Sequence, residues 1–384
     1  MIRRLNPMLL RLAPATLLLV AAGALAQGPM RPKPVDRPTD ARANLCLVDS
    51  LAANLTDTYV FPETAGSMVQ ALQANRSRYE SIASSVELAD ALTHDLQEIS
   101  HDKHLRVVYR ERAIPERTAE EYGPEELARQ QKESRIRNFG FEKVQRMMGN
   151  VGYLEMRSFA GSDSGAIAAA TAAMNFLGNV DALIIDLREN GGGDPEMVAR
   201  ITSYLYAAGE RIHLNDLYWR PGNHTEEFWT LADVPGPRLD GKDVFVLTSG
   251  YTFSAAEEFC YNLKNLKRAT IVGETTGGGA HPGTLVRLAD HFEMFCPTGR
   301  AINPISKTNW EGTGVAPDIA CTADEALSMA HISAIEKLLA RATDPEDRQR
   351  LSMGLDKARA DAAEPGGKGQ APPGGGPRII VRGN

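Results

Sequence analysis

The sequence predicts an α/β fold with a largely parallel, buried sheet. Apolar segments of strand length alternate with segments of helical pattern, and Gly-containing loops follow three of the strands. This alternation is typical of βαβ units, whose sheets are covered on both faces. Ligands bind such sheets at the carboxyl ends of the strands, so we expect the three loops to share one active-site edge. The expected strands are 151–156, 182–187, 243–248 and 269–273, the helices 164–178, 195–207 and 254–266, and the loops 190–193, 249–254 and 275–279.

Composition narrows the class of protein. The chain has 384 residues, of which 43% are hydrophobic and 24% charged, as in ordinary globular proteins. That length suggests about two domains. A net charge of −7 provides no basic surface for nucleic acid. Four cysteines are too few for a disulfide-built scaffold, and they include no CxxC pair and no zinc-ligand spacing. We expect no nucleic-acid partner.

The first 26 residues have the pattern of a secretory signal peptide. Arg3 and Arg4 precede a short apolar run at 17–22, and the segment closes on Ala24-Leu25-Ala26. A basic region, an apolar region and an A-x-A sequence together predict cleavage after Ala26. A membrane anchor is the alternative, but Pro, Gly and Ala dilute the uncharged run. We expect a periplasmic or secreted protein that has no membrane association once the signal is removed.

The rest of the chain is expected to form successive units. Apolar residues recur at three- and four-residue steps through much of 44–100, which predicts helices, and the Gly/Pro-rich end of the chain lacks the apolar residues needed for a core. The expected units are a leader (27–43), a helical N-terminal domain (44–110), a polar linker (111–140), the α/β core (141–330), C-terminal helices (331–363) and a disordered tail (364–384).

Ser254 is the first candidate for chemistry. A strand ends near Thr248, a turn containing Gly250 follows, and Ser254 begins the next helix. The first N–H groups of a helix are unpaired and favour negative charge. The Ala255 N–H is therefore a candidate oxyanion donor beside a serine nucleophile. The alternative is a serine that only caps its helix.

The second candidate is the loop after the strand at 182–187. It reads Asn190-Gly191-Gly192-Gly193, and consecutive glycines let backbone N–H groups approach an anion. Neither GxxxxGK[ST] nor GxGxxG is present, so a phosphate loop is disfavoured. An oxyanion contribution from Gly191 or Gly192 fits better, and a plain turn is the alternative.

These loops occur together with Gly273-Glu274-Thr275-Thr276-Gly277-Gly278-Gly279 and with the segment 312–319. In this order, the motifs resemble the C-terminal processing (tail-specific) serine peptidase family, above all the branch of tricorn core domains and interphotoreceptor retinoid-binding protein modules. The resemblance spans about 45–330. It implies a crotonase-like (ClpP/crotonase) core with a small helical N-terminal domain, with Ser254 as nucleophile and with Gly191 and Ala255 as the oxyanion hole.

The sequence departs from the processing peptidases at the catalytic base. Their lysine lies in a G-K-G motif, but here the stretch is Gly277-Gly278-Gly279. The tricorn-like branch uses a histidine from the N-terminal side, and His104 matches its D-x-H-x-x-V pattern. His281 is the alternative base. His101 and His104 as metal ligands would lack a third partner.

A histidine base needs a group that holds its tautomer. The resemblance implies Glu311 as this orienting acid, with Asp318 and Glu274 as alternatives. Features of PDZ domains are missing from 30–140, so recognition of a substrate's C-terminal end is not expected from this sequence. We predict an exported serine peptidase that acts on a peptide or protein and requires no cofactor or metal. A non-catalytic module for a hydrophobic ligand and a hydrolase of small-molecule amides or esters are the alternatives.

Overall fold

The computed structural model describes residues 35–116 and 124–363. The predicted signal peptide, residues 27–34 of the leader and the predicted disordered tail lie outside these ranges. Within them, no helix combines the length and apolar character needed to cross a bilayer. All four cysteines are free thiols.

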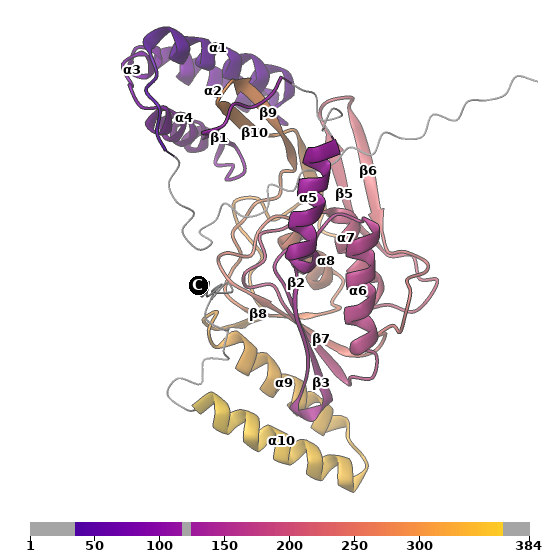
Figure 1. The fold of residues 1–384 in the computed structure, drawn as a ribbon. Helices are drawn as coiled ribbons and strands as arrows, with labels where there is room; N and C mark the ends of the chain where they lie inside the picture. Colours follow the sequence, from indigo (N-terminus) through magenta and orange to yellow (C-terminus); the bar gives the residue numbers. More distant parts are fainter. Residues whose placement is uncertain (1–34, 117–123, 364–384) are drawn as a thin grey trace, which may run out of the picture.

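A six-stranded sheet forms the centre of the molecule (Figure 1). Its strand order is β12-β8-β7-β4-β3-β2, and every neighbouring pair is parallel except β2 with β3. The sequence predicted four of these strands, and the mixed α/β class is confirmed. The strands are β2 (Phe141–Met147), β3 (Val151–Met156), β4 (Ala182–Asp186), β7 (Asp243–Thr248), β8 (Thr270–Gly273) and β12 (Ile319–Ala320).

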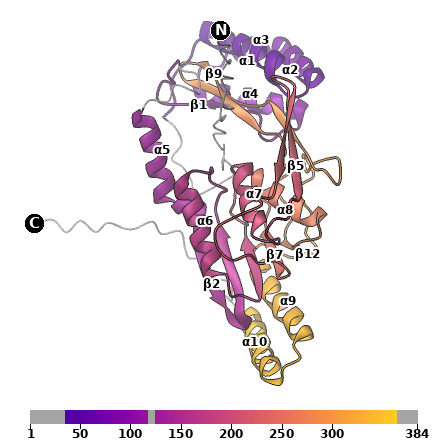
Figure 2. The same ribbon diagram turned by 90° about the vertical axis from the view of Figure 1, so that its right-hand side faces the viewer.

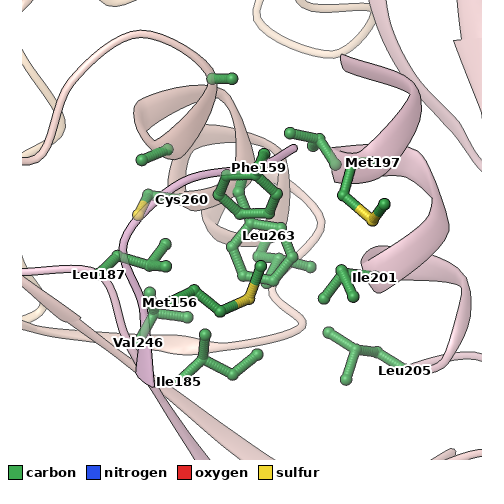
Figure 3. Close-up of a cluster of buried hydrophobic side chains, with 14 of the residues drawn as sticks. Met156, Phe159, Ile185, Leu187, Met197, Ile201, Leu205, Val246, Cys260 and Leu263 are labelled. Atoms are coloured by element: carbon green, nitrogen blue, oxygen red, sulfur yellow. The ribbon is translucent and has the colours of Figure 1, made fainter. Parts of the chain in front are cut away.

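Helices cover both faces of this sheet. Because side chains alternate along a strand, Leu183 and Ile185 of β4 pack beneath one helical layer, while Ala182 and Ile184 pack beneath the other. Figure 3 shows the first of these cores, with Met197, Ile201 and Leu263 above the strands. The first layer contains α6 (Ser164–Phe176), α7 (Pro195–Ser203) and α8 (Ala255–Asn265), and the second contains α9 (Ala326–Arg341) and α10 (Pro345–Ala363).

The N-terminal helices form a separate cluster at the opposite end of the molecule from α9 and α10 (Figures 1 and 2). Two of them begin at side-chain caps: Asp40 accepts from the N–H of Ala43, and Ser84 accepts from the N–H of Glu87. Their apolar stripes pack together in one core. The helices are α1 (Ala41–Thr58), α2 (Pro62–Ala74), α3 (Arg76–Glu80) and α4 (Ser85–Ser100).

A hairpin from far along the chain completes this helical cluster. Strand β1 (Arg106–Tyr109) pairs antiparallel with β10 (Phe292–Pro297), which pairs with β9 (Gly283–Ala289). Side chains of the hairpin, Met294 among them, share the core of the helices. The sequence analysis grouped 283–297 with the unit 141–330. The short strand β1 requires these partners because its backbone groups must find hydrogen bonds.

The remaining elements lie between and beside these two parts. Helix α5 (Pro124–Ile136) occupies the predicted polar linker, and two 3₁₀ turns, η2 (Asn138–Gly140) and η3 (Met148–Asn150), flank β2. A third sheet, in the order β11-β5-β6, was not predicted. Its strands are β5 (His213–Trp219), β6 (His224–Trp229) and β11 (Gly299–Ile302).

Candidate functional site

The three loops singled out in the sequence meet at the carboxyl edge of the central sheet. The N–H of Phe253 donates to the carbonyl of Asn190 at 3.1 Å, which joins the loop after β7 to the loop after β4. The N–H of Gly277 donates to the carbonyl of Thr252 at 2.9 Å, which joins the loop after β8. Residues from three separate parts of the chain therefore lie around Ser254.

Ser254 holds an unusual backbone conformation at the start of α8. Its φ is 56° and its ψ is −124°, and the residue is half-buried. A positive φ outside the left-handed helical region is strained for a residue with a Cβ, and such strain concentrates at functional sites. The conformation persists because the surrounding loops hold it, including a 2.9 Å bond from the Ser254 N–H to Oε2 of Glu257.

The glycine loop lies directly against Ser254. A Cβ on Gly192 would lie 2.7 Å from the Cβ of Ser254, so only glycine fits there. The Gly192 N–H donates to Oδ1 of Asn190 at 2.9 Å. By contrast, within the part of the chain that the structure describes, the N–H groups of Gly191 and Ala255 donate to no protein acceptor. These are the two donors predicted for an oxyanion hole, and Gly192 is excluded from that role.

Glu257 is a structural residue of the site that the sequence analysis missed. Its buried carboxylate also accepts from Oγ1 of Thr276 at 2.5 Å and from the N–H groups of Gly278 and Gly279 at 2.6 and 2.8 Å. Burial raises its pKa to about 7, and these hydrogen bonds act in the opposite direction. A glutamate three residues after a helix-starting serine is the capping-box pattern, which was the available signal.

The structure disfavours a lysine at Gly278, where the resemblance places the lysine of the processing peptidases. Gly278 has a φ of 81°, and a Cβ there would lie 3.0 Å from the N of Gly314 and 3.2 Å from the carbonyl carbon of Gly312. The backbone of segment 312–314 thus lies against the position that the Cβ of such a lysine would occupy. If Ser254 is a nucleophile, its base is therefore expected from another residue.

His104 lies beside the loop that leads into Ser254. Its side chain is only 3% exposed, and its ring packs against that of Phe253 with centroids 4.6 Å apart. A Cβ on Gly279 would lie 2.7 Å from its Cε1, so a glycine is needed on this side as well. Burial lowers the pKa of His104 to about 4, which keeps the imidazole neutral at physiological pH. Its Nδ1 has no hydrogen-bond partner among the residues that the structure describes.

Asp102, to which the sequence analysis gave no role, is the centre of a buried network. One carboxylate oxygen accepts from the backbone N–H of His104 at 3.0 Å. The other lies 2.8 Å from Nδ1 of His281 and 3.3 Å from the hydroxyl of Tyr59. Its position in the D-x-H motif was the signal that pointed to it.

His281 and Glu311 complete the network. Nδ1 of His281 lies 3.4 Å from Oε2 of Glu311, which also accepts from the N–H of Ala280 at 2.5 Å. Burial opposes the charge on His281, but Asp102 and then Glu311 outweigh it and raise its pKa. Burial and the charge of Asp102 raise the pKa of Glu311 to about 7. Within residues 35–116 and 124–363, Oε1 of Glu311 has no hydrogen-bond partner.

The other candidate residues lie elsewhere. Glu274 accepts from the N–H groups of Gly250 and Ala323, and Asp318 pairs with Lys264 at 2.9 Å. His101 is exposed at the end of α4. The structure brings none of the three into contact with His104 or His281.

A cation could be considered at this network, because one ligand atom each from Asp102, His104 and Glu311 lie within 4.8 Å of one another. However, the imidazole of His281 already contacts both carboxylates. We therefore interpret the cluster as an acid–base network.

Two family models match this chain. Peptidase family S41 matches residues 150–321, and the N-terminal domain of Peptidase_S41 in eukaryotic IRBP matches residues 41–138. The chain is 27% identical to a carboxy-terminal-processing protease of Bartonella bacilliformis over 177 residues, which are 45% of this chain and 39% of that protein. It is 31% identical to a tail-specific protease of Haemophilus influenzae over 98 residues, 26% of this chain and 13% of that protein. The matched region is thus less than half the length of these relatives.

Solved structures share the fold. Mature CPAF aligns with a TM-score of 0.53 at 13% identity, covering 77% of this chain and 97% of that one. A putative peptidase from Parabacteroides merdae aligns with a TM-score of 0.52 at 18% identity, covering 80% and 99%. The two family models, which together cover more than half of the chain, confirm the resemblance inferred from four ordered motifs: the chain belongs to peptidase family S41.

Proposed function

We propose that this chain is an exported serine peptidase with Ser254 as its nucleophile. The observation that carries the proposal is the strained Ser254. Among the described residues, the N–H groups of Gly191 and Ala255 beside it have no acceptor, and the ring of Phe253, the residue before it, packs against a neutral, buried His104. A serine that only caps its helix would need neither a strained backbone, nor N–H donors left open beside it, nor a neutral imidazole nearby.

The reaction follows from this arrangement. A neutral His104 takes the proton of the Ser254 hydroxyl as its oxygen attacks the peptide carbonyl carbon. The carbonyl π electrons move to oxygen, and the N–H groups of Gly191 and Ala255 stabilise the negative charge that results. The imidazolium then gives its proton to the leaving nitrogen as the C–N bond breaks. Water repeats the sequence on the acyl-enzyme and releases the second product.

We assign the orientation of His104 to Glu311. Nδ1 of His104 and Oε1 of Glu311 are the two buried atoms of this network that lack partners, and one can donate while the other accepts. A ring nitrogen of His104 and a carboxylate oxygen of Glu311 lie within 4.8 Å. A small movement on substrate binding would close this hydrogen bond, since catalytic bonds are often long in free enzymes.

His104 is favoured over His281 as the base because of what each ring contacts. His104 packs against Phe253, which directly precedes Ser254, whereas His281 packs against Phe61 of the helical part with ring centroids 5.2 Å apart. Nδ1 of His281 is also occupied by Asp102.

Three further points belong to the proposal. The sheet of βαβ units, with N–H donors at its carboxyl edge, supports a crotonase-like core. Residues 1–26 have the signal pattern that supports export to the periplasm or outside the cell. The family supports a peptide or protein as substrate.

A second candidate is a non-catalytic module for a hydrophobic ligand. The match of 41–138 to a domain of eukaryotic IRBP favours it. A ligand-binding module has no need for a reactive serine, so the two functions differ in one measurable property.

Labelling with a fluorophosphonate probe tests the proposed function. We expect the probe to modify Ser254, identified by mass spectrometry of the digested protein, and to leave Ser254→Ala unlabelled. Ser67→Ala, on α2, is the matched control and should label normally. Incubation of both variants with a peptide library should give new peptide ends only where Ser254 is intact. Absence of labelling in the folded protein would favour the binding module, and labelling without peptide cleavage would favour a small-molecule hydrolase.

A further inference from the structure

A buried contact between an aspartate and a histidine joins the helical part of the molecule to the α/β core. Asp102 lies between α4 and β1, and His281 lies in the loop between β8 and β9. Their side chains, 179 residues apart in sequence, meet at 2.8 Å and are 0% and 7% exposed. The neighbouring Lys103 reaches the same loop, where its Nζ donates to the carbonyl of Gly277 at 2.6 Å.

The surroundings of His281 favour a positive charge on its ring. The carboxylates of Asp102 and Glu311 both contact Nδ1. Two other groups act on this ring. The charge of Arg300 lowers the pKa of His281, and a charge on His281 lowers the pKa of His104, so the two histidines disfavour each other's protonation. Without a cation between them, the carboxylates of Asp102 and Glu311 would repel each other. An imidazolium between them removes that conflict.

The same carboxylate controls the position of His104. Oδ2 of Asp102 binds His281, while Oδ1 accepts the backbone N–H of His104. A continuous chain of two hydrogen bonds therefore runs from the core loop, through Asp102, to the main chain of the proposed base. Tyr59 supports the centre of this chain from the end of α1.

We propose that Asp102 and His281 are positioning residues: their ion pair fixes the segment bearing His104 against the core, and His104 serves Ser254 only while this pair is formed. This proposal rests on the proposed function. It gives His281 a role different from that of an alternative base, and it gives Asp102 a role that the sequence did not predict.

The pair makes activity sensitive to alkaline pH. The pKa of His281 is raised above 6.5 by Asp102 and Glu311, so the imidazolium is the major form at pH 6.5 and is lost as the pH rises through the raised value. Loss of the proton weakens the attachment of Asp102 and so of His104. Because a displacement of about 1 Å can cost on the order of 100-fold in rate, an alkaline limb in kcat follows.

Variants of the full-length protein test this role through the pH profile. His281→Gln keeps a donor but cannot carry charge, and Asp102→Asn removes the negative partner. We expect both to lose about 10- to 100-fold in kcat, with a smaller change in KM, and His281→Gln to lose the alkaline limb. The double variant should be no worse than Asp102→Asn alone, because the two residues act as one unit. His213→Gln, which removes a His–Asp contact of 2.6 Å on β5, is the control and should match the unmodified protein. An alkaline limb unchanged in His281→Gln, or additive losses in the double variant, would overturn the proposal.

A measurement on Ser254→Ala separates this proposal from the proposed function. Histidine ring NMR of this variant should show His281 titrating above 6.5, and Asp102→Asn should lower that pKa by about one unit or more. A pKa near 6.5 in both proteins would refute the ion pair, whatever the enzyme does. A raised pKa of His281, together with an unmodified protein that neither reacts with the fluorophosphonate probe nor cleaves peptides, would support the ion pair and refute the peptidase.

Discussion

The ring of His104 packs against the ring of Phe253, the residue directly before Ser254, with centroids 4.6 Å apart. This contact brings the proposed base, from the helical part, to the proposed nucleophile at the start of α8. Gly279 makes the approach possible, because a Cβ there would clash with both rings. The site is thus assembled across two parts of the molecule.

Replacing His104 by alanine should lower kcat/KM by more than ~100-fold, since a general base contributes about that much. Hydrolysis of a peptide found in the library experiment gives the rate. His101→Ala changes an exposed histidine three residues away and should have little effect. Near-normal turnover of His104→Ala would transfer the role of base to His281.

The acid limb of kcat/KM should contain a step well below pH 6.5. Burial lowers the pKa of His104 to about 4, so the neutral, active form persists above that pH and is lost below it. Glu311, whose pKa is raised to about 7, can add a second step near neutrality. Plots of kcat/KM against pH for the unmodified protein and for Glu311→Gln distinguish the two steps, because only the step assigned to His104 should remain in the variant. A single step at 6.5 or above in Glu311→Gln would contradict this assignment.

Introducing the lysine of the processing peptidases should not restore activity. Gly278→Lys places a Cβ 3.0 Å from backbone at Gly314, at a φ of 81° that favours glycine. We expect Gly278→Lys to lower the Tm and to leave His104→Ala inactive when the two are combined. Gly278→Ala separates the backbone effect from the lysine. Recovery of turnover in the combined variant would show that a Ser–Lys dyad fits this fold.

Gly192→Ala should abolish labelling of Ser254 by displacing the glycine loop. Its Cβ would lie 2.7 Å from the Cβ of Ser254, and the φ of Gly192 is 110°. Gly209→Ala is the matched control, because Gly209 also has a positive φ, of 83°, but has open space around it. The control should cost about 1 kcal/mol in unfolding free energy and keep its labelling. Equal labelling of Gly192→Ala and Gly209→Ala would show that the glycine loop is not needed for the reaction of Ser254 with the probe.

Glu258→Gln should flatten the dependence of stability on pH. Burial raises the pKa of Glu258 from 4.5 to about 8, with Asp194 acting in the same direction. The folded protein therefore binds this proton more tightly than the unfolded chain, and the unfolding free energy falls as the pH rises from 4.5 to 8. Glutamine cannot titrate, so the Tm of the variant should fall less between pH 5 and 8. An unchanged slope would show that Glu258 is ionised throughout.

Much of the central fold followed from local sequence patterns. A strand buried on both faces must be apolar along its whole length, so Leu183, Ile184 and Ile185 predicted a covered parallel sheet. The order of strand, loop and helix also placed Ser254 at a helix start and the free N–H groups beside it. Periodicity could not reveal the hairpin 283–297 as part of the helical cluster, because strand pairing over that distance leaves no local signal.

The sequence by itself determined the chemical groups: a serine at a helix start, a glycine loop, a histidine in D-x-H and no lysine in the third motif. Only the tertiary structure decided how they act together. It gave Ser254 its strained φ, directed His281 to Asp102 and closed the space beside Gly278. Such relationships depend on packing between residues that are remote along the chain, where burial sets both the geometry and the pKa, and neither is encoded within a short segment.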